Sequence, residues 1–136
     1  NKKLELIKKR LNDDSYKAYG IIKNGVLVYS TWISMSNMGL PVKSKYILNQ
    51  DEGLLEDSYC HPSERGKGLH SSMNFYRLMK LYELGKTISL VIVLDGNSPA
   101  YKVQMKSGFK DAGVFYAGII FGIPFSTLNK RKYDNR

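Results

Sequence analysis

The sequence has little cysteine and little acid. Cys60 is the single cysteine among 136 residues, so no disulfide can form within the chain, and this usage suits a reducing compartment such as the cytoplasm. Only 12 acidic residues stand against 21 basic ones, which gives a net charge of +9. This balance indicates an anionic partner but does not choose between nucleic acid, an anionic membrane, an acidic carrier protein and a polyphosphate.

Long apolar runs are also missing. The longest, residues 113–125, is too short for a membrane-spanning helix and contains Gly and Pro, so we expect no membrane span. Apolar residues make up 43% of the chain and charged residues 24%, the balance of a single globular domain over residues 1–136. The first residue is Asn1 rather than Met, which predicts a processed product or a fragment truncated at its N-terminus.

Basic residues gather near both ends of the chain. We expect them to be solvated charge runs, as such runs usually are. They are Lys2, Lys3, Lys8, Lys9, Arg10, Lys130, Arg131, Lys132 and Arg136.

Periodicity and turn residues predict the order of the elements. The prediction is a helix over residues 2–11, strands over 16–23 and 26–34, a long connection over 35–53, a strand over 54–60, a helix over 66–84, a strand over 88–94, a helix from 97 to 108 and two strands within 109–128 that break near residues 122–124. The strongest local signal is Asn24-Gly25, two residues that tolerate positive φ, between runs of β-formers. The fold class is therefore α/β, a mixed sheet with helices on its faces.

Two of these elements carry further expectations. In the helix over 66–84, Leu69, Met73, Tyr76 and Leu84 are expected to form a buried stripe, with Gly85 as the stop signal. Residues 88–94 (ISLVIVL) form a nearly continuous apolar run rich in β-branched residues, which predicts a central strand covered on both faces.

The segment Pro62–Gly68 joins a strand to a helix. A helix start leaves backbone N–H groups unpaired at the positive end of the helix dipole, where a pyrophosphate is stabilised. Gly66 and Gly68 let the backbone approach phosphate oxygens closely, while Arg65 and Lys67 add charge. The third glycine of a dinucleotide-binding fingerprint is absent, because Ser71 takes its place. From these residues alone, a phosphate site and an ordinary tight turn both remain open.

Two motifs in the right order resemble the superfamily of GCN5-related N-acetyltransferases. Arg65-x-x-Gly68-x-His70 is similar to that family's first cofactor motif, and Asn97-x-x-Ala100 followed by Gly108-Phe109 is similar to its second. The resemblance covers residues 16–129. It implies a mixed, mostly antiparallel central sheet in which the parallel strands over 54–60 and 88–94 splay apart, and it implies that the family's first strand is absent here.

The resemblance also implies an activity, the transfer of an acetyl group from acetyl-CoA to the amine of a small-molecule acceptor, with no metal. The implied cofactor-binding residues are Tyr59 and Cys60 toward the pantetheine arm, Arg65, Gly66, Lys67, Gly68, Leu69 and His70 at the pyrophosphate, and Asn97 near the sulfur. Two alternatives stay open: an acyl carrier protein as donor, and a basic module that binds CoA or nucleic acid without catalysis. Nucleic acid is the less expected ligand, because no recognised motif for it is present.

Glu56 and Tyr101 are the candidate catalytic residues. Glu56, or its neighbour Asp57, stands on the strand that leads into the implied site and is a candidate base for the acceptor amine. Relatives often carry a tyrosine seven residues after the asparagine as a general acid; that position here is Gln104, and Tyr101 lies one helical turn earlier. The side chain of His70 is expected to be a bystander, and Cys60 to be a buried thiol rather than a nucleophile.

Overall fold

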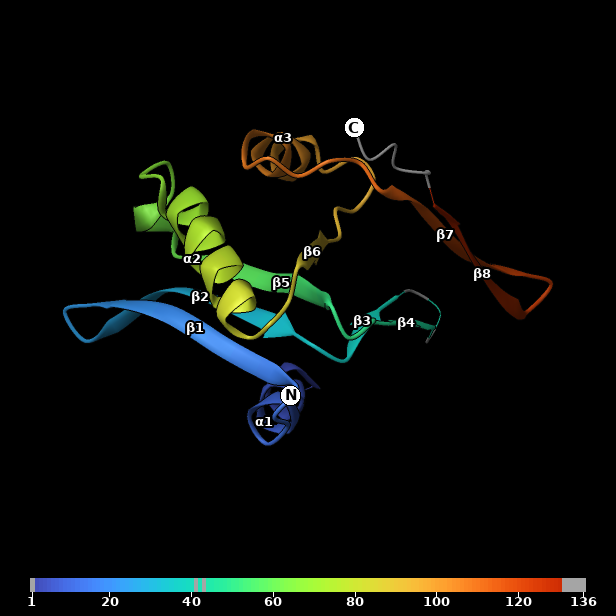
Figure 1. Ribbon diagram of the computed structural model, residues 1–136, viewed down its shortest axis with the longest axis horizontal. Helices are drawn as coiled ribbons and strands as arrows, with labels where there is room; N and C mark the ends of the chain where they lie inside the picture. The colour runs from blue at the N-terminus through green and yellow to red at the C-terminus, as the bar shows by residue number, and fades with distance from the viewer. Residues whose placement is uncertain (1, 41, 43, 131–136) are drawn as a thin grey trace.

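A computed structural model describes residues 2–40, 42 and 44–130, so Asn1 and the predicted charge run at residues 131–136 lie outside the described residues. Its elements are α1 (Lys2–Leu11), β1 (Tyr16–Lys23), β2 (Val26–Ser34), β3 (Asn37–Gly39), β4 (Lys45–Ile47), β5 (Glu52–Cys60), the 3-10 turn η1 (Pro62–Glu64), α2 (Leu69–Glu83), β6 (Ile88–Val91), α3 (Ser98–Lys106), β7 (Gly113–Ile120) and β8 (Ile123–Lys130). Figure 1 gives their arrangement.

The central sheet has the strand order β1-β2-β5-β6. β2 is antiparallel to both of its neighbours, β1 and β5, and β6 is parallel to β5. Neighbouring strand residues point to opposite faces, and α2 reaches Thr31 through Arg77 whereas α1 reaches Trp32 through Arg10. The two helices therefore cover opposite faces, as Figure 1 shows. The predicted fold class, a mixed sheet that contains a parallel pair, is confirmed.

The predicted hairpin is confirmed with the predicted bounds. β1 and β2 pair from Tyr16↔Ser34 to Lys23↔Val26. The turn residues Asn24 and Gly25 have φ of 50° and 77°. Both lie in the left-handed region that asparagine and glycine tolerate best, which is why this dipeptide sets the register of the hairpin.

The helix predicted over 66–84 begins three residues later, at Leu69, and its buried face differs from the predicted stripe. Met73 is buried as expected, but Tyr76 and Leu84 are 36% and 39% exposed. The stripe prediction counted apolar residues only. The face that meets the sheet also includes the polar Asn74 and Arg77, which are each 1% exposed. Gly85, with φ of 75°, follows the helix as predicted.

The prediction of a long connection over residues 35–53 was wrong in the central part of this segment. It contains the short hairpin β3–β4, and β5 begins at Glu52 rather than at residue 54. Glu52 is buried because its carboxylate accepts hydrogen bonds from the Asn49 N–H, at 2.8 Å, and from the Tyr46 hydroxyl. A buried charge stabilised in this way lets the strand start early.

The prediction of a central strand over residues 88–94 was wrong in the length of the strand and in its position in the sheet. β6 ends at Val91, and within the described residues it is an edge strand rather than a central one. The two strands predicted within 109–128 do form, as β7 and β8, with the turn at Phe121-Gly122 rather than at residues 122–124. They make a two-stranded sheet apart from the central one.

The core lies between β2, β5 and α2, where Ile33, Leu55 and Leu81 are buried together. Gly53 lies beside this cluster, because a Cβ built on it would stand 2.3 Å from Leu81 Cδ2. A side chain at this position would therefore force Leu81 to move.

Gly53→Ala should destabilise the fold by about 1–3 kcal/mol, because an added methyl group overpacks the contact between α2 and β5. Urea unfolding followed by circular dichroism measures the change. Gly39→Ala is the matched control, since nothing lies within 4 Å of its Cβ position. Equal stability of the two variants would contradict this account of the core.

Candidate functional site

The turn that precedes α2 presents a row of free backbone donors. Gly66 and Gly68 have φ of 77° and 76°, and Gly68 is the N-cap of α2 with no side-chain hydrogen bond to cap the helix. Within the described chain, the backbone N–H groups from Gly66 to Ser71 have no hydrogen-bond acceptor. A helix start of this kind is an anion-binding geometry, because these N–H groups and the helix dipole act together.

The charged side chains of the turn are tied to their neighbours. Arg65 Nε donates to the carbonyl of Cys60 at 3.2 Å, which anchors the turn to the end of β5. Glu64 accepts from Lys23 and Lys67, at 2.5 and 3.1 Å, and these hydrogen bonds lower the pKa of its carboxyl. The turn before α2 therefore carries less net positive charge than Arg65 and Lys67 alone would give it.

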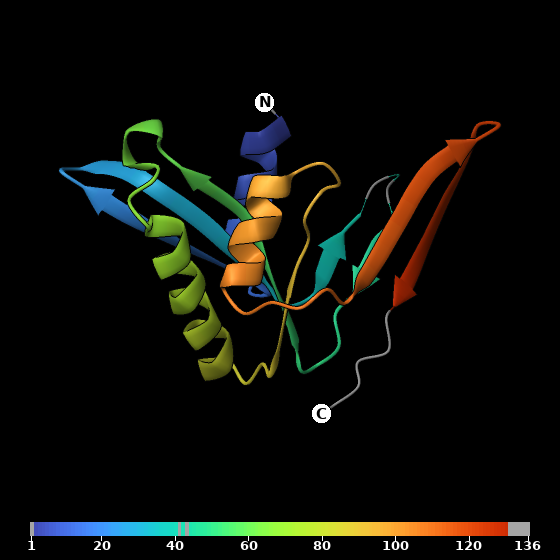
Figure 2. The ribbon, with the colours of Figure 1, turned by 90° about the horizontal axis from the view of Figure 1, so that it is seen from above.

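β5 and β6 diverge next to this turn. Their parallel pairing runs from Glu52↔Ile88 to Leu55↔Val91 and stops there, while β5 continues to Cys60 against β2. Residues 56–60 of β5 and residues 92–94 no longer pair with each other, and we call these two segments the divergence. The chain after β6 rises away from β5 toward α3 (Figure 2). The splayed parallel pair that the resemblance implied is present, with backbone of β5 that β6 does not pair.

A bulge changes the direction of β5 within the divergence. The register with β2 shifts between Ser30↔Tyr59 and Trp32↔Glu56, and Asp57 has φ of 48°. One extra residue in a strand bends it and re-aims its side chains. Glu56 and Tyr59 thus lie on either side of the bulge, with Glu56 the first β5 residue beyond the last pair to β6.

Glu56 lies on the α1 face of the sheet, beside Arg10. Its Oε1 is 3.1 Å from Arg10 Nη2, an ion pair without hydrogen-bond alignment, and this buried oxygen has no hydrogen bond in the described residues. Burial raises the pKa of the Glu56 carboxyl; Arg10 lowers it and Asp57 raises it. A half-buried carboxylate with a raised pKa and an oxygen that accepts no hydrogen bond has the properties of a general base.

Arg10 was expected to be solvated and is not. Its side chain is 11% exposed, pairs with Glu56 and Asp57, and lies over the rings of Tyr16 and Trp32 at 5.2 and 5.5 Å. No local pattern in the sequence signals this, since its partners are more than forty residues away on β5. The two aromatic rings and the two carboxylates together hold the guanidinium of Arg10 in this position.

On the opposite face, His70 turns its side chain into the fold. Its Nδ1 lies 2.7 Å from the hydroxyl oxygen of Tyr29, with which it shares a hydrogen bond. Burial, and to a lesser degree Arg77, lowers the pKa of the His70 imidazole. The hydrogen bond therefore holds the ring against β2, whereas the backbone N–H of His70 belongs to the row of free donors at the helix start.

A buried polar layer that the sequence did not reveal joins α2, β2 and α3. Arg77 donates to Thr31 Oγ1 at 2.5 Å and to Asn74 Oδ1, and Asn74 donates to Gln104 Oε1 at 3.1 Å. Burial lowers the pKa of Arg77, and its Nε has no hydrogen-bond partner. The only available signal was the (i, i+3) spacing of Asn74 and Arg77, which on a helix is more often solvent-exposed.

The structure separates the residues of α3 that the sequence grouped together. Gln104 is buried and bonded to Asn74, whereas Tyr101 is 45% exposed. Asn97 caps α3 as predicted, accepting from the Ala100 N–H at 3.3 Å, which leaves its side-chain NH₂ as a donor. Gln104 thus positions α3 against α2, whereas Tyr101 lies on an exposed part of the helix.

No protein-family model and no curated protein matches the sequence, but solved structures match the fold. An aminoglycoside N-acetyltransferase in complex with CoA aligns with a TM-score of 0.65 and 17% identity over 81% of this chain and 79% of that one. The fold is that of the GCN5-related N-acetyltransferases.

Two further structures share this acetyltransferase fold. The aminoglycoside 6'-N-acetyltransferase of Acinetobacter haemolyticus aligns with a TM-score of 0.65 and 12% identity over 99% of this chain and 79% of that one. A predicted acetyltransferase of Clostridium acetobutylicum with acetyl-CoA aligns with a TM-score of 0.59 and 17% identity over 81% of this chain and 68% of that one. No helix among the described residues has the length and apolar content to cross a membrane.

Thr31→Val should cost about 1.5–3 kcal/mol of stability, because it removes an acceptor from a buried guanidinium. In an Arg77→Met background the same change should cost less, since no charge is then left without its partner. Denaturant unfolding of the four proteins of this cycle measures the coupling free energy. A coupling near zero would mean that the polar layer contributes nothing through this pair.

Proposed function

We propose that this chain is an N-acetyltransferase domain that transfers the acetyl group of acetyl-CoA to the amine of a small molecule. The observation that carries the proposal is the row of unpaired N–H groups from Gly66 to Ser71 beside the divergence of β5 and β6. The solved neighbours that hold CoA and acetyl-CoA support it. Nothing in the described residues favours an acyl carrier protein as the donor.

The pyrophosphate of acetyl-CoA fits the turn before α2. Backbone N–H groups of Gly66, Lys67, Gly68, Leu69 and His70 donate to its oxygens. The absence of a Cβ at the two glycines allows this approach, and nothing lies within 4 Å of either Cβ position. Arg65, held against Cys60, contributes positive charge without crowding the backbone donors.

The pantetheine arm enters the divergence. There the backbone N–H of Cys60 pairs with an amide group of the arm in place of a neighbouring strand. The Cys60 carbonyl already accepts from Arg65, and Tyr59 lies opposite Ser30 of β2. The side-chain NH₂ of Asn97 donates to the arm near the sulfur. The bend at Asp57 aims the last residues of β5 toward the turn that holds the pyrophosphate.

In the reaction, the acceptor amine attacks the thioester carbon. Glu56 accepts the proton that the amine loses, the new N–C bond forms, and the C–S bond breaks. A backbone N–H near Cys60 stabilises the charge that develops on the carbonyl oxygen. The departing thiolate takes a proton from solvent or from Tyr101, which is 45% exposed and is the candidate acid because Gln104 has no acidic proton.

Acetyl-CoA should raise the melting temperature, because selective binding to the folded state stabilises it by about 2.7 kcal/mol at roughly 100 times Kd. Gly68→Glu should abolish this rise, since it sets an anion where the pyrophosphate binds. Thermal unfolding with and without acetyl-CoA measures both.

The matched control is Gly85→Glu. Gly85 has φ of 75° with open space around it, so the backbone strain is the same, but it lies at the other end of the 15-residue helix, about 22 Å away. That variant should keep the ligand-induced rise. Retention of the rise in Gly68→Glu would place the cofactor elsewhere.

Glu56→Gln should reduce kcat/KM by roughly 10²–10⁴-fold, because the base is lost. The wild-type kcat/KM should increase with pH as Glu56 loses its proton, and this acid limb should lie above the ordinary carboxyl range because burial raises the pKa. Initial rates with an amine acceptor across a pH series measure the limb.

Two variants that keep Glu56 should move the acid limb in opposite directions. Arg10→Met removes a cation that lowers the pKa of Glu56, so the limb should move to higher pH. Asp57→Asn removes an anion that raises this pKa, so the limb should move to lower pH. If neither substitution moves the acid limb, the base is a residue other than Glu56.

A further inference from the structure

The carboxylate proposed as the base is already in contact with a cation of its own chain. Arg10 Nη2 lies 3.1 Å from Glu56 Oε1, and Arg10 Nη1 pairs with Asp57. The Glu56 Oε1 atom is buried, and the Glu56 side chain as a whole is 19% exposed. An acceptor amine that gives its proton to Glu56 must therefore take a place that Arg10 and its helix, α1, now cover.

The surroundings of the Arg10 guanidinium have the composition of a general cation site. The rings of Tyr16 and Trp32 have their centroids 5.2 and 5.5 Å from the guanidinium carbon. The carboxylates of Glu56 and Asp57 pair with its two terminal nitrogens. We call these four residues, which come from β1, β2 and β5, the cage. Aromatic faces and carboxylates also bind ammonium groups, so the cage suits an amine ligand as well as a guanidinium.

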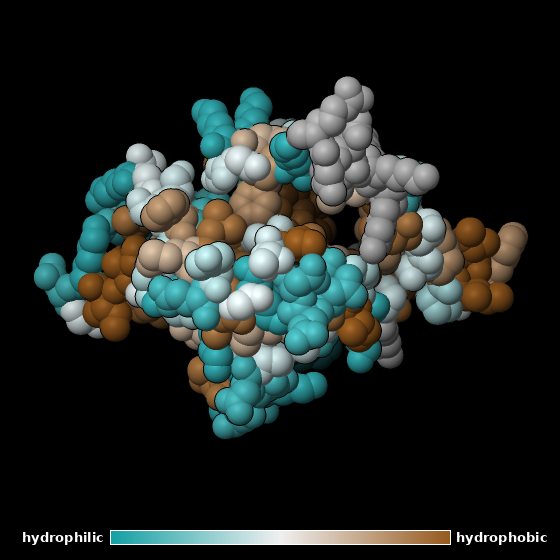
Figure 3. Space-filling model, in the orientation of Figure 1, coloured by the Kyte–Doolittle hydropathy of each residue, from teal (hydrophilic) through white to brown (hydrophobic). Residues whose placement is uncertain are grey.

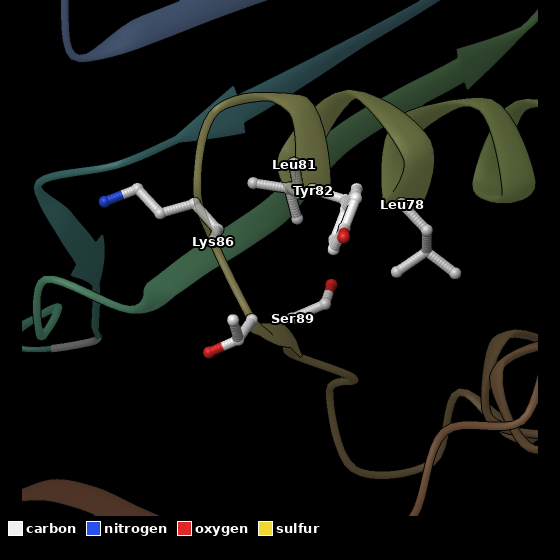
Figure 4. A pocket seen from close by; sticks show the side chains of 6 residues that line it. Leu78, Leu81, Tyr82, Lys86 and Ser89 are labelled. Carbon is white, nitrogen blue, oxygen red and sulfur yellow. The ribbon is translucent and has the colours of Figure 1, made fainter.

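A hollow of about 280 Å³ beside β6, under the C-terminal half of α2, does not have this composition (Figure 4). The described residues that line it include an amine and no carboxylate. They are Leu78, Leu81, Tyr82, Lys86, Thr87 and Ser89. Lys86 would repel a second cation there, so the cage on the α1 face is the better place for an amine.

α1 itself is only lightly packed on the sheet. None of its described residues is buried, and Leu4 and Leu11 are 49% and 65% exposed. Figure 3 shows the helix as a mostly hydrophilic projection at the lower edge of the molecule. Arg10 is the residue through which α1 contacts the cage on all three of its strands. The helix therefore loses little apolar burial when Arg10 leaves the cage, and local opening of this kind costs less than unfolding.

We propose that the cage binds an ammonium group of the acceptor, and that Arg10 closes the cage in the free protein until the acceptor displaces it. The choice of an amine as the ligand rests on the proposed function. Without Arg10 the cage carries two carboxylates, so a compound with two neighbouring amino groups matches it better than a monoamine does. One amino group lies beside Glu56 and reacts, while the other stays charged beside Asp57. α1 is then a strap that the acceptor itself opens.

Trp32 is the only tryptophan of the chain, so its fluorescence reports on the cage directly. Putrescine, a linear diamine, should change this emission with a saturable dependence on concentration, and butylamine, the matched monoamine, should bind more weakly. Arg10→Ala should bind putrescine at least about tenfold more tightly than the wild type, because an open state that is populated for a tenth of the time or less lowers the apparent affinity by that factor.

The matched control is Lys9→Ala, which removes the same charge from an exposed position of the same helix and should keep the wild-type Kd. In the Arg10→Ala background, Asp57→Asn should remove the preference for putrescine over butylamine, because the second carboxylate is then absent. Asparagine tolerates the φ of 48° at this position. Equal affinity of the wild type and Arg10→Ala for putrescine would overturn the proposal, as would a Trp32 emission that shows no saturable change.

Hydrogen exchange of the wild-type protein tests the displacement without any substitution. Saturating putrescine should speed up amide exchange over α1, because the helix loses the contacts that Arg10 makes. Unchanged or slower exchange over α1 would overturn the proposal, since the amine would then bind without opening the strap. These measurements contain no acetyl-CoA, so their outcome is independent of the melting experiment with Gly68→Glu, which tests the proposed function separately.

Discussion

The early end of the pairing between β5 and β6 is the constraint on which the site depends. Four parallel pairs hold the strands together, and beyond Leu55↔Val91 each follows a different path. β5 stays with β2, because Thr31 bonds both the Glu56 carbonyl and the Ser58 hydroxyl across the bulge. The strand that remains therefore exposes backbone groups toward the divergence, and it ends where the turn before α2 begins. Without this separation the helix tip would present its donors to solvent alone.

The buried polar layer determines where that helix tip lies. Arg77 has no carboxylate near it in the described residues; its charge is satisfied by Thr31 and Asn74. Neutral acceptors bind a guanidinium less strongly than a carboxylate does, but their hydrogen bonds still fix the orientation of its N–H groups. Arg77 thus fixes the rotation of α2 over β2, and Asn74 extends the same set of bonds to Gln104 of α3. The two helices α2 and α3, whose starts resemble the family's two cofactor motifs, are therefore positioned by one connected set of bonds.

The sequence predicted those parts of the molecule that depend on local residues. Asn24-Gly25, the start of β6 and the cap at Asn97 follow from backbone conformation, which a few neighbouring residues decide. The predicted buried stripe of α2 was wrong at Tyr76 and Leu84. Which face of a helix is buried depends on the residues that it packs against, and here Thr31 on β2 accepts a hydrogen bond from Arg77. The role of Arg10 was missed for the same reason, because ion pairs between residues more than forty positions apart produce no periodic pattern in the sequence. The turn at Gly66–Gly68 was expected from two glycines before a helix, whereas its use as a phosphate site came from the resemblance and stays a prediction.

The strand β6 links the two halves of the molecule. Its inner side contributes to the divergence, whereas its outer side is an unpaired apolar edge. Residues 92–94 have the composition of a strand but lack a strand partner on either side in the described chain. β-structure at such residues depends on cross-strand packing rather than on intrinsic preference. The path of residues 92–94 is therefore set by the chain that leads to α3 and not by a neighbouring strand, whereas β5 is held on its course by β2.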